Sequence, residues 1–153
     1  MITIRFLADH LDTVPALAEW FRAQWPDYFA AMSQEELEQD FLEAASRDRL
    51  PIRLVAFESS ELAGTMVLRE NGTEMLREFQ PELGGLYVAK SHRNHGIATE
   101  LIRAGMQVAR AQGYDLVFAT TVAAAGILER LGWEYLQPVV YQDGPTALYR
   151  CKL

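Results

Sequence analysis

Residues 86–102, LYVAKSHRNHGIATELI, hold the strand-to-helix transition on which the fold prediction rests. The apolar first residues predict a strand over 84–90. Apolar side chains then recur at helical spacing from Ile97 to Ala109, and Gly113 follows as a C-terminal cap. This pattern predicts a helix that begins directly after Gly96, with a short basic loop before it.

The start of this helix is suited to binding an anion. A helix N-terminus leaves about four amide N–H groups unpaired and carries roughly half a unit of positive charge. Gly96 and Ala98 leave room for a phosphate to approach those amides, while Lys90, Arg93 and His95 add positive charge. The loop matches neither the Walker pattern nor the dinucleotide fingerprint. A glycine turn before an ordinary surface helix explains the same residues about equally well.

The rest of the chain predicts a mixed α/β domain that spans residues 1–153. Further strands are expected over 2–7, 51–57, 62–69, 114–121, 134–141 and 146–153, and further helices after Thr13, after Ser33 and over 123–131. The order is β-α-α-β-β-β-α-β-α-β-β, with a right-handed parallel crossover around residue 90. The adjacent Gly84 and Gly85 predict a bulge in the strand that precedes the loop.

Composition excludes several classes of function. The 153 residues carry a net charge of −7, which disfavours nucleic-acid binding and mildly favours a cationic substrate. No apolar run reaches the roughly 20 residues of a membrane span. The first ten residues lack the pattern of a signal peptide, and the single cysteine, Cys151, cannot form an internal disulfide. We therefore expect a cytoplasmic protein without a membrane or nucleic-acid partner.

The segment Arg93-Asn94-His95-Gly96-Ile97-Ala98 fits the pattern [QR]-x-x-G-x-[GA]. Together with the element order and with ILERLGW (127–133), it resembles the acetyl-CoA loop of the GNAT superfamily of N-acetyltransferases, in a bacterial-type form. The resemblance implies the GNAT fold: a mixed central sheet of about seven strands, flanked by four helices, with splayed parallel strands at the acetyl-CoA site. It also implies acetyl-CoA as cosubstrate and direct acetyl transfer to a primary amine of a small molecule or peptide.

The same resemblance assigns the cosubstrate-binding residues by position. It implies that the backbone of Leu86, Tyr87 and Val88 binds the pantetheine arm, and that Thr121 stands where relatives often carry an asparagine for the same arm. It implies that Arg93 begins the pyrophosphate site and that the amides of the next six residues complete it: Asn94, His95, Gly96, Ile97, Ala98 and Thr99.

The catalytic residues are less fully determined by the resemblance. Glu82 stands where the histone-acetylating branch carries its glutamate base, with Glu78, Glu74 or water as alternatives and a solvated loop glutamate as the simplest reading. The position of the usual acid tyrosine holds Leu128, so Tyr141 or Tyr135 would have to replace it, or the thiolate leaves without an acid.

Several alternatives stay open at this point. His92-x-x-His95 invites a metal reading, but no third ligand is evident in the sequence, so we expect no metal. Leu128 at the acid position leaves room for a non-catalytic acyl-CoA-binding module on the same fold. A purely structural interaction domain would require the 92–102 stretch to be an ordinary turn. Exposed edge strands make a homodimer conceivable, although no residue specifies it.

Overall fold

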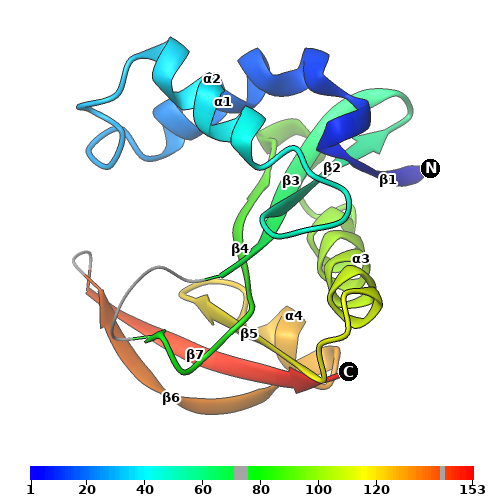
Figure 1. Ribbon diagram of the computed structural model, residues 1–153, viewed down its shortest axis with the longest axis vertical. Coiled ribbons are helices and arrows are strands. Elements are labelled where there is room, and N and C mark those ends of the chain that lie inside the picture. Colours follow the sequence, from blue (N-terminus) through cyan, green and yellow to red (C-terminus); the bar gives the residue numbers. More distant parts are fainter. Residues whose placement is uncertain (71–75, 142–143) are drawn as a thin grey trace.

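The computed structural model describes residues 1–70, 76–141 and 144–153, and within them it contains a seven-stranded sheet in the order β1-β2-β3-β4-β5-β7-β6 (Figure 1). Its strands are β1 (Ile2–Phe6), β2 (Ile52–Glu58), β3 (Glu61–Arg69), β4 (Glu82–Val88), β5 (Leu116–Thr121), β6 (Glu134–Tyr141) and β7 (Gly144–Lys152). Only β4 and β5 pair in parallel among these strands. The mixed sheet and its parallel pair confirm the predicted fold class.

Four α-helices lie in the described residues: α1 (Val14–Gln24), α2 (Gln34–Glu43), α3 (Ile97–Ala111) and α4 (Ala125–Arg130). Short 3-10 turns are η1 (Leu7–Asp9), η2 (Leu11–Thr13) and η4 (Lys90–His92). None of these helices has the length and apolar character needed to cross a membrane.

The helices cover the two faces of the sheet (Figure 1). On one face, Leu17 and Phe21 of α1 and Phe41 of α2 pack with Val55 of β2. On the other, α3 and α4 pack against the strands through a larger core that includes Leu101 and Trp133. Residues of β2 and β4 alternate between the two cores, as period-2 strands require.

Local signals explain where several elements begin. The capping box predicted before α2 is present, because the Glu36 amide donates to Ser33 Oγ at 3.1 Å and the Ser33 amide donates to Glu36 Oε1 at 3.3 Å. Thr13 occupies the N-cap position of α1 as predicted, but its hydroxyl donates to the His10 carbonyl at 2.7 Å instead of capping the helix.

The predicted boundaries of β4 are wrong by two residues at each end. The strand runs from Glu82 to Val88, two residues before the predicted 84–90 at both limits. Residues 90–92 form the turn η4 instead, because the amide of His92 donates to the Ala89 carbonyl at 2.9 Å. The chain therefore leaves the sheet earlier than its apolar pattern indicates, and η4 carries it to the start of α3.

Candidate active site

The parallel strands β4 and β5 separate almost as soon as they have paired. Their register contains the single pair Glu82↔Phe118, beside which the Phe118 amide donates to the Pro81 carbonyl at 2.9 Å. Beyond this point, the described residues show no ladder between the two strands, while the other edge of β4 stays paired with β3 as far as Val88. The edge of β4 that faces β5 therefore offers backbone donors and acceptors to a ligand.

A bulge interrupts β4 where the two strands part. The register with β3 shifts between Thr65 and Val67, opposite the glycine pair, and Gly85 has φ +57°. A positive φ is costly for residues with a Cβ, which explains the glycine. The bulge predicted from Gly84-Gly85 is confirmed.

The helix α3 begins at the same end of β4. Its N-cap is Gly96, with φ +87°, and Asn94 also adopts a positive φ of 66°. The first intrahelical bond of this cap runs from the Glu100 amide to the Gly96 carbonyl at 3.1 Å. The amides of the preceding first turn, residues 97–99, are those that a helix cannot pair internally. They lie at an N-terminus whose dipole favours anions.

The basic side chains of the 93–98 loop are held by the protein. Arg93 Nε donates to the Val88 carbonyl at 2.9 Å, and its guanidinium lies 5.7 Å from the Tyr87 ring centroid. The His95 ring faces Glu58 on the β2–β3 hairpin, with Nδ1 2.7 Å from Oε1. Arg93 is therefore bonded to β4 and His95 to β2, and the backbone amides of the loop are the groups available to a ligand.

Glu58 also binds His92, which forms a cluster that local sequence reasoning missed. His92 Nδ1 lies 2.6 Å from Glu58 Oε1, and its Nε2 lies 3.1 Å from Glu61 Oε2. The hydrogen bonds from His92 and then His95 lower the pKa of Glu58, and the bond to Glu58 raises the pKa of His92. Glu58 precedes His92 by 34 residues, so no local pattern in the sequence indicates this contact.

Glu82 lies beside the bulge and is almost fully buried, with 3% of its surface exposed. Its Oε1 accepts hydrogen bonds from Nε and Nη2 of Arg69, at 3.0 and 2.9 Å. Both groups lie 2.8 Å from the point where a Cβ on Gly84 would sit. Hence an ion pair covers the backbone of the bulge, and a side chain at position 84 would displace it.

The guanidinium of Arg53 lies close to the bulge on the face of the sheet that α1 and α2 cover. Arg53 of β2 is buried between the rings of Phe21 and Phe41, 5.3 and 4.7 Å from their centroids, and its Nη1 donates to Thr65 Oγ1 at 3.1 Å. Its Nη2 lies 3.1 Å from the position of a Cβ on Gly85. Burial lowers the pKa of Arg53 to about 9.

This geometry can be compared with known proteins. The model of a family described as the acetyltransferase (GNAT) family matches residues 14–133. The chain belongs to this family. Acetyl-CoA is the cosubstrate of GNAT acetyltransferases, so the splayed strands and the start of α3 form the candidate active site.

Individual relatives agree with this membership. The chain is similar to N-acetyltransferase 8B of Homo sapiens, with 30% identity over an alignment of 130 residues that covers 81% of this chain and 56% of that protein. It spans little more than half the length of that relative. Among solved structures, its fold is similar to ribosomal-protein-alanine N-acetyltransferase from Brucella melitensis (TM-score 0.77, 21% identity, 99% of each chain). It is also similar to yncA from Salmonella typhimurium, solved with acetyl-CoA (TM-score 0.74, 16% identity, 99% and 94% of the chains).

The residues considered for the GNAT acid lie in different surroundings. Leu128 is buried in the core with 3% of its surface exposed. Tyr135 is 51% exposed, and its ring packs on Tyr149 with 5.7 Å between centroids. Tyr141 ends β6, but its side chain lies outside the described residues, as does all of Glu74. Sequence reasoning did not single out Tyr149, whose hydroxyl donates to Glu129 at 3.0 Å and whose pKa is raised mainly by burial.

Thr121, at the end of β5, takes part in the turn toward α4. Its Oγ1 accepts a hydrogen bond from the Ala124 amide at 2.7 Å. The hydroxyl proton is not used by that bond, so Thr121 can still donate one hydrogen bond. Its contact with the pantetheine arm stays a prediction.

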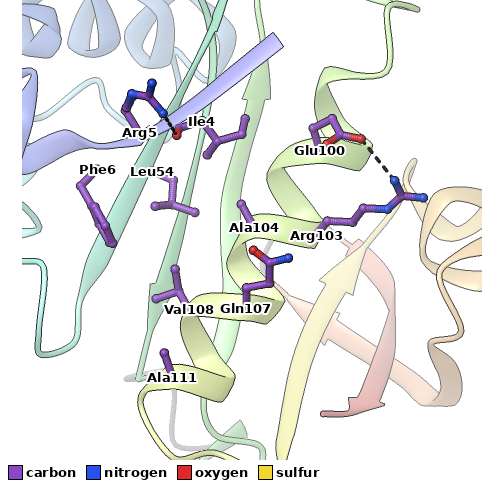
Figure 2. Close-up of a pocket in the computed structure, with 10 residues that line it drawn as sticks. All are labelled: Ile4, Arg5, Phe6, Leu54, Glu100, Arg103, Ala104, Gln107, Val108 and Ala111. Atoms are coloured by element: carbon purple, nitrogen blue, oxygen red, sulfur yellow. Dashed lines mark hydrogen bonds and ion pairs between the residues drawn. The ribbon is translucent and has the colours of Figure 1, made fainter.

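A groove of about 460 Å³ lies elsewhere, between the edge strand β1 and α3 (Figure 2). Ile4 and Leu54 line it from the sheet and Val108 lines it from the helix, while Glu100 and Arg103 form an ion pair at 3.3 Å at its side. Two strands, β2 and β3, separate β1 from β4 in the sheet. The groove is therefore distinct from the candidate active site.

Proposed function

We propose that this protein is an acetyl-CoA-dependent N-acetyltransferase whose acceptor is a primary amine of a small molecule or peptide. The observation that carries the proposal is the junction of three features: the unpaired edge of β4, the bulge at Gly85 and the amide-rich start of α3. A thioester lying in the gap would have its carbonyl at the bulge and its phosphates at the helix start. A turn before an ordinary surface helix would not require the strands to part.

In this proposal, β4 and the residues after it bind different parts of acetyl-CoA. We assign the pantetheine arm to the backbone of Leu86, Tyr87 and Val88, with Thr121 opposite on β5. The pyrophosphate is assigned to the amides of residues 94–99: Asn94, His95, Gly96, Ile97, Ala98 and Thr99. Arg93 would hold the C-terminal end of β4 in place through its bond to the Val88 carbonyl.

The reaction needs no covalent enzyme intermediate. The neutral amine attacks the thioester carbonyl carbon, an amide N–H of β4 stabilises the oxyanion, and the C–S bond breaks to release CoA as thiolate. The ammonium formed by the attack loses its proton to a base, and the thiolate takes one from an acid or from water. We propose Tyr141, at the end of β6, as the acid in place of Leu128.

We propose Glu82 as the base. Its carboxylate lies over the bulge, where the acyl carbonyl would be, and its negative charge favours the approach of an ammonium group. The hydrogen bonds from Arg69 Nε and Nη2 hold the carboxylate in this position. Aromatic side chains of Trp20 and Trp25 around the Tyr87 ring, at 5.3 and 6.2 Å between centroids, would form the acceptor side of the site.

Thermal unfolding with acetyl-CoA, CoA, ATP or NAD tests the cosubstrate. We expect stabilisation by acetyl-CoA and CoA alone, about 2.7 kcal/mol at 100 times Kd. A panel of amines, including an aminoglycoside and a peptide with an N-terminal alanine, then tests turnover through release of the free CoA thiol. CoA binding without turnover of any amine would favour a non-catalytic acyl-CoA-binding module. No stabilisation by either CoA species would refute both functions.

The Glu82→Gln variant tests the base. We expect kcat/KM to fall by about 10²-fold or more and the acidic limb of its pH profile to disappear. Glu134→Gln is the matched control, because Glu134 also accepts a hydrogen bond from an arginine, Arg150, at 2.6 Å but lies exposed at the start of β6. An unchanged rate and pH profile in Glu82→Gln would remove Glu82 from the mechanism.

Two further properties are proposed from the surface and the cysteine. Cys151 is buried with a free thiol, which agrees with a reducing, cytoplasmic location. The edge strands β1 and β6 offer backbone groups for pairing in a homodimer. Light scattering of the purified protein measures its mass in solution and decides on the dimer.

A further inference from the structure

The fold brings a third potential metal ligand, Glu58, next to the two histidines of the His92-x-x-His95 motif. His92-x-x-His95 supplies two imidazoles, and Glu58 from the end of β2 supplies a carboxylate beside them. One ligand atom from each of these three residues lies within 4.8 Å of the other two. The third ligand whose absence argued against a metal is thus present, 34 residues before His92.

A metal ion can replace the two hydrogen bonds to Glu58 Oε1 after small movements of the side chains. The Nδ1 atoms of His92 and His95 lie 2.6 and 2.7 Å from the same oxygen, Glu58 Oε1. Around a tetrahedral zinc ion with bonds of about 2.1 Å, neighbouring ligand atoms are about 3.4 Å apart. Each contact would therefore have to open by roughly 0.7 Å, which a small rotation of an imidazole or carboxylate achieves.

The surroundings of His92 resemble the outer contacts of known metal sites. Histidine ligands usually donate their second ring N–H to a carboxylate, which fixes the tautomer. Glu61 Oε2 lies 3.1 Å from His92 Nε2 and can accept that hydrogen bond, leaving the Nδ1 lone pair for a metal. The ring of His92 is held in place by burial, whereas His95 is exposed and opens the cluster to solvent.

We propose that Glu58 Oε1, His92 Nδ1 and His95 Nδ1 bind a divalent transition-metal ion of the zinc class, with water as the fourth ligand. Two imidazoles and one carboxylate are a ligand set that zinc accepts in open sites. The charges of Glu58 and Glu61 balance those of the ion. The bound ion ties the β2–β3 hairpin to the 93–98 loop and thereby stabilises the folded protein. The site does not depend on acetyl transfer.

The test uses the metal alone. Protein stripped with EDTA and dialysed is titrated with Co²⁺, monitored by visible absorption, and with Zn²⁺ in competition with a chromophoric chelator. We expect one ion per chain and a higher unfolding temperature with Zn²⁺. The His95→Ala and Glu58→Gln variants should bind at least tenfold more weakly, and their unfolding in EDTA shows that they fold.

The His10→Ala variant is the control, because His10 packs on the Phe57 ring, 4.9 Å between centroids, and is the third histidine of the chain. It should bind zinc like the wild type. Equal affinity in wild type and His95→Ala, or absence of 1:1 binding by the wild type, would overturn the proposal. Because no acetyl-CoA is present, such a failure leaves the proposed enzyme activity standing.

Discussion

A comparison of two glycines, one at each end of α3, distinguishes the effect of backbone strain on stability from the effect of a side chain on ligand binding. Gly96 has φ +87° and Gly113, beyond the other end of the helix, has φ +92°; a Cβ at either position would meet no atom within 4 Å. In both Gly96→Ala and Gly113→Ala the cost to the free protein is therefore strain alone, about 1–2 kcal/mol. For a chain of this size, we expect both unfolding temperatures to fall by roughly 2–8 °C.

Only Gly96 lies where the pyrophosphate is proposed to bind. A methyl group there would hold the phosphate away from the first-turn amides, and we expect Kd for acetyl-CoA to rise at least tenfold. With acetyl-CoA at 100 times the wild-type Kd, wild type and Gly113→Ala gain about 2.7 kcal/mol. A tenfold weaker Gly96→Ala gains about 1.4 kcal/mol under the same conditions.

Thermal unfolding with and without acetyl-CoA measures both quantities on the same samples. The difference of about 1.3 kcal/mol in ligand stabilisation corresponds to roughly 3–5 °C. Equal ligand-induced shifts in Gly96→Ala and Gly113→Ala would refute the assignment of the phosphate to this loop. A much larger loss of stability in ligand-free Gly96→Ala than in Gly113→Ala would contradict the reasoning about strain.

Three other changes follow from contacts in the structure. The Cβ of Gly64→Ala would lie 2.8 Å from the Tyr87 carbonyl of the neighbouring strand, so the variant should lose about 1–3 kcal/mol in urea unfolding, and an unchanged midpoint would contradict this clash. Arg93→Ala removes a bond to the Val88 carbonyl at an exposed site; we expect weaker acetyl-CoA binding in calorimetry and a stability within about 1 kcal/mol of wild type. Burial raises the pKa of Cys151, so at pH 8 the folded protein should react with a thiol reagent far more slowly than the urea-unfolded chain, and equal rates would show an accessible thiolate.

Much of the fold was predictable because it depends on residues close together in the chain. The capping box at Ser33, the bulge at Gly84-Gly85 and the small residues before α3 each report a local backbone requirement. The boundaries of β4 were less predictable, since Ala89 continues the apolar run for one residue past Val88 and the turn η4 begins directly after it. Apolar pattern marks burial, and burial alone does not distinguish a strand end from a buried turn.

The sequence by itself determined the strand, the loop and the helix start, because amide groups, glycine and helix dipole act within a few residues. Only the tertiary structure decided which side chains meet around them. Arg69 donates hydrogen bonds to Glu82, and the guanidinium of Arg53 lies close to Gly85. Glu58 contacts both His92 and His95. These pairs are brought together by sheet register and hairpin geometry, which fix positions across strands that the local sequence cannot align.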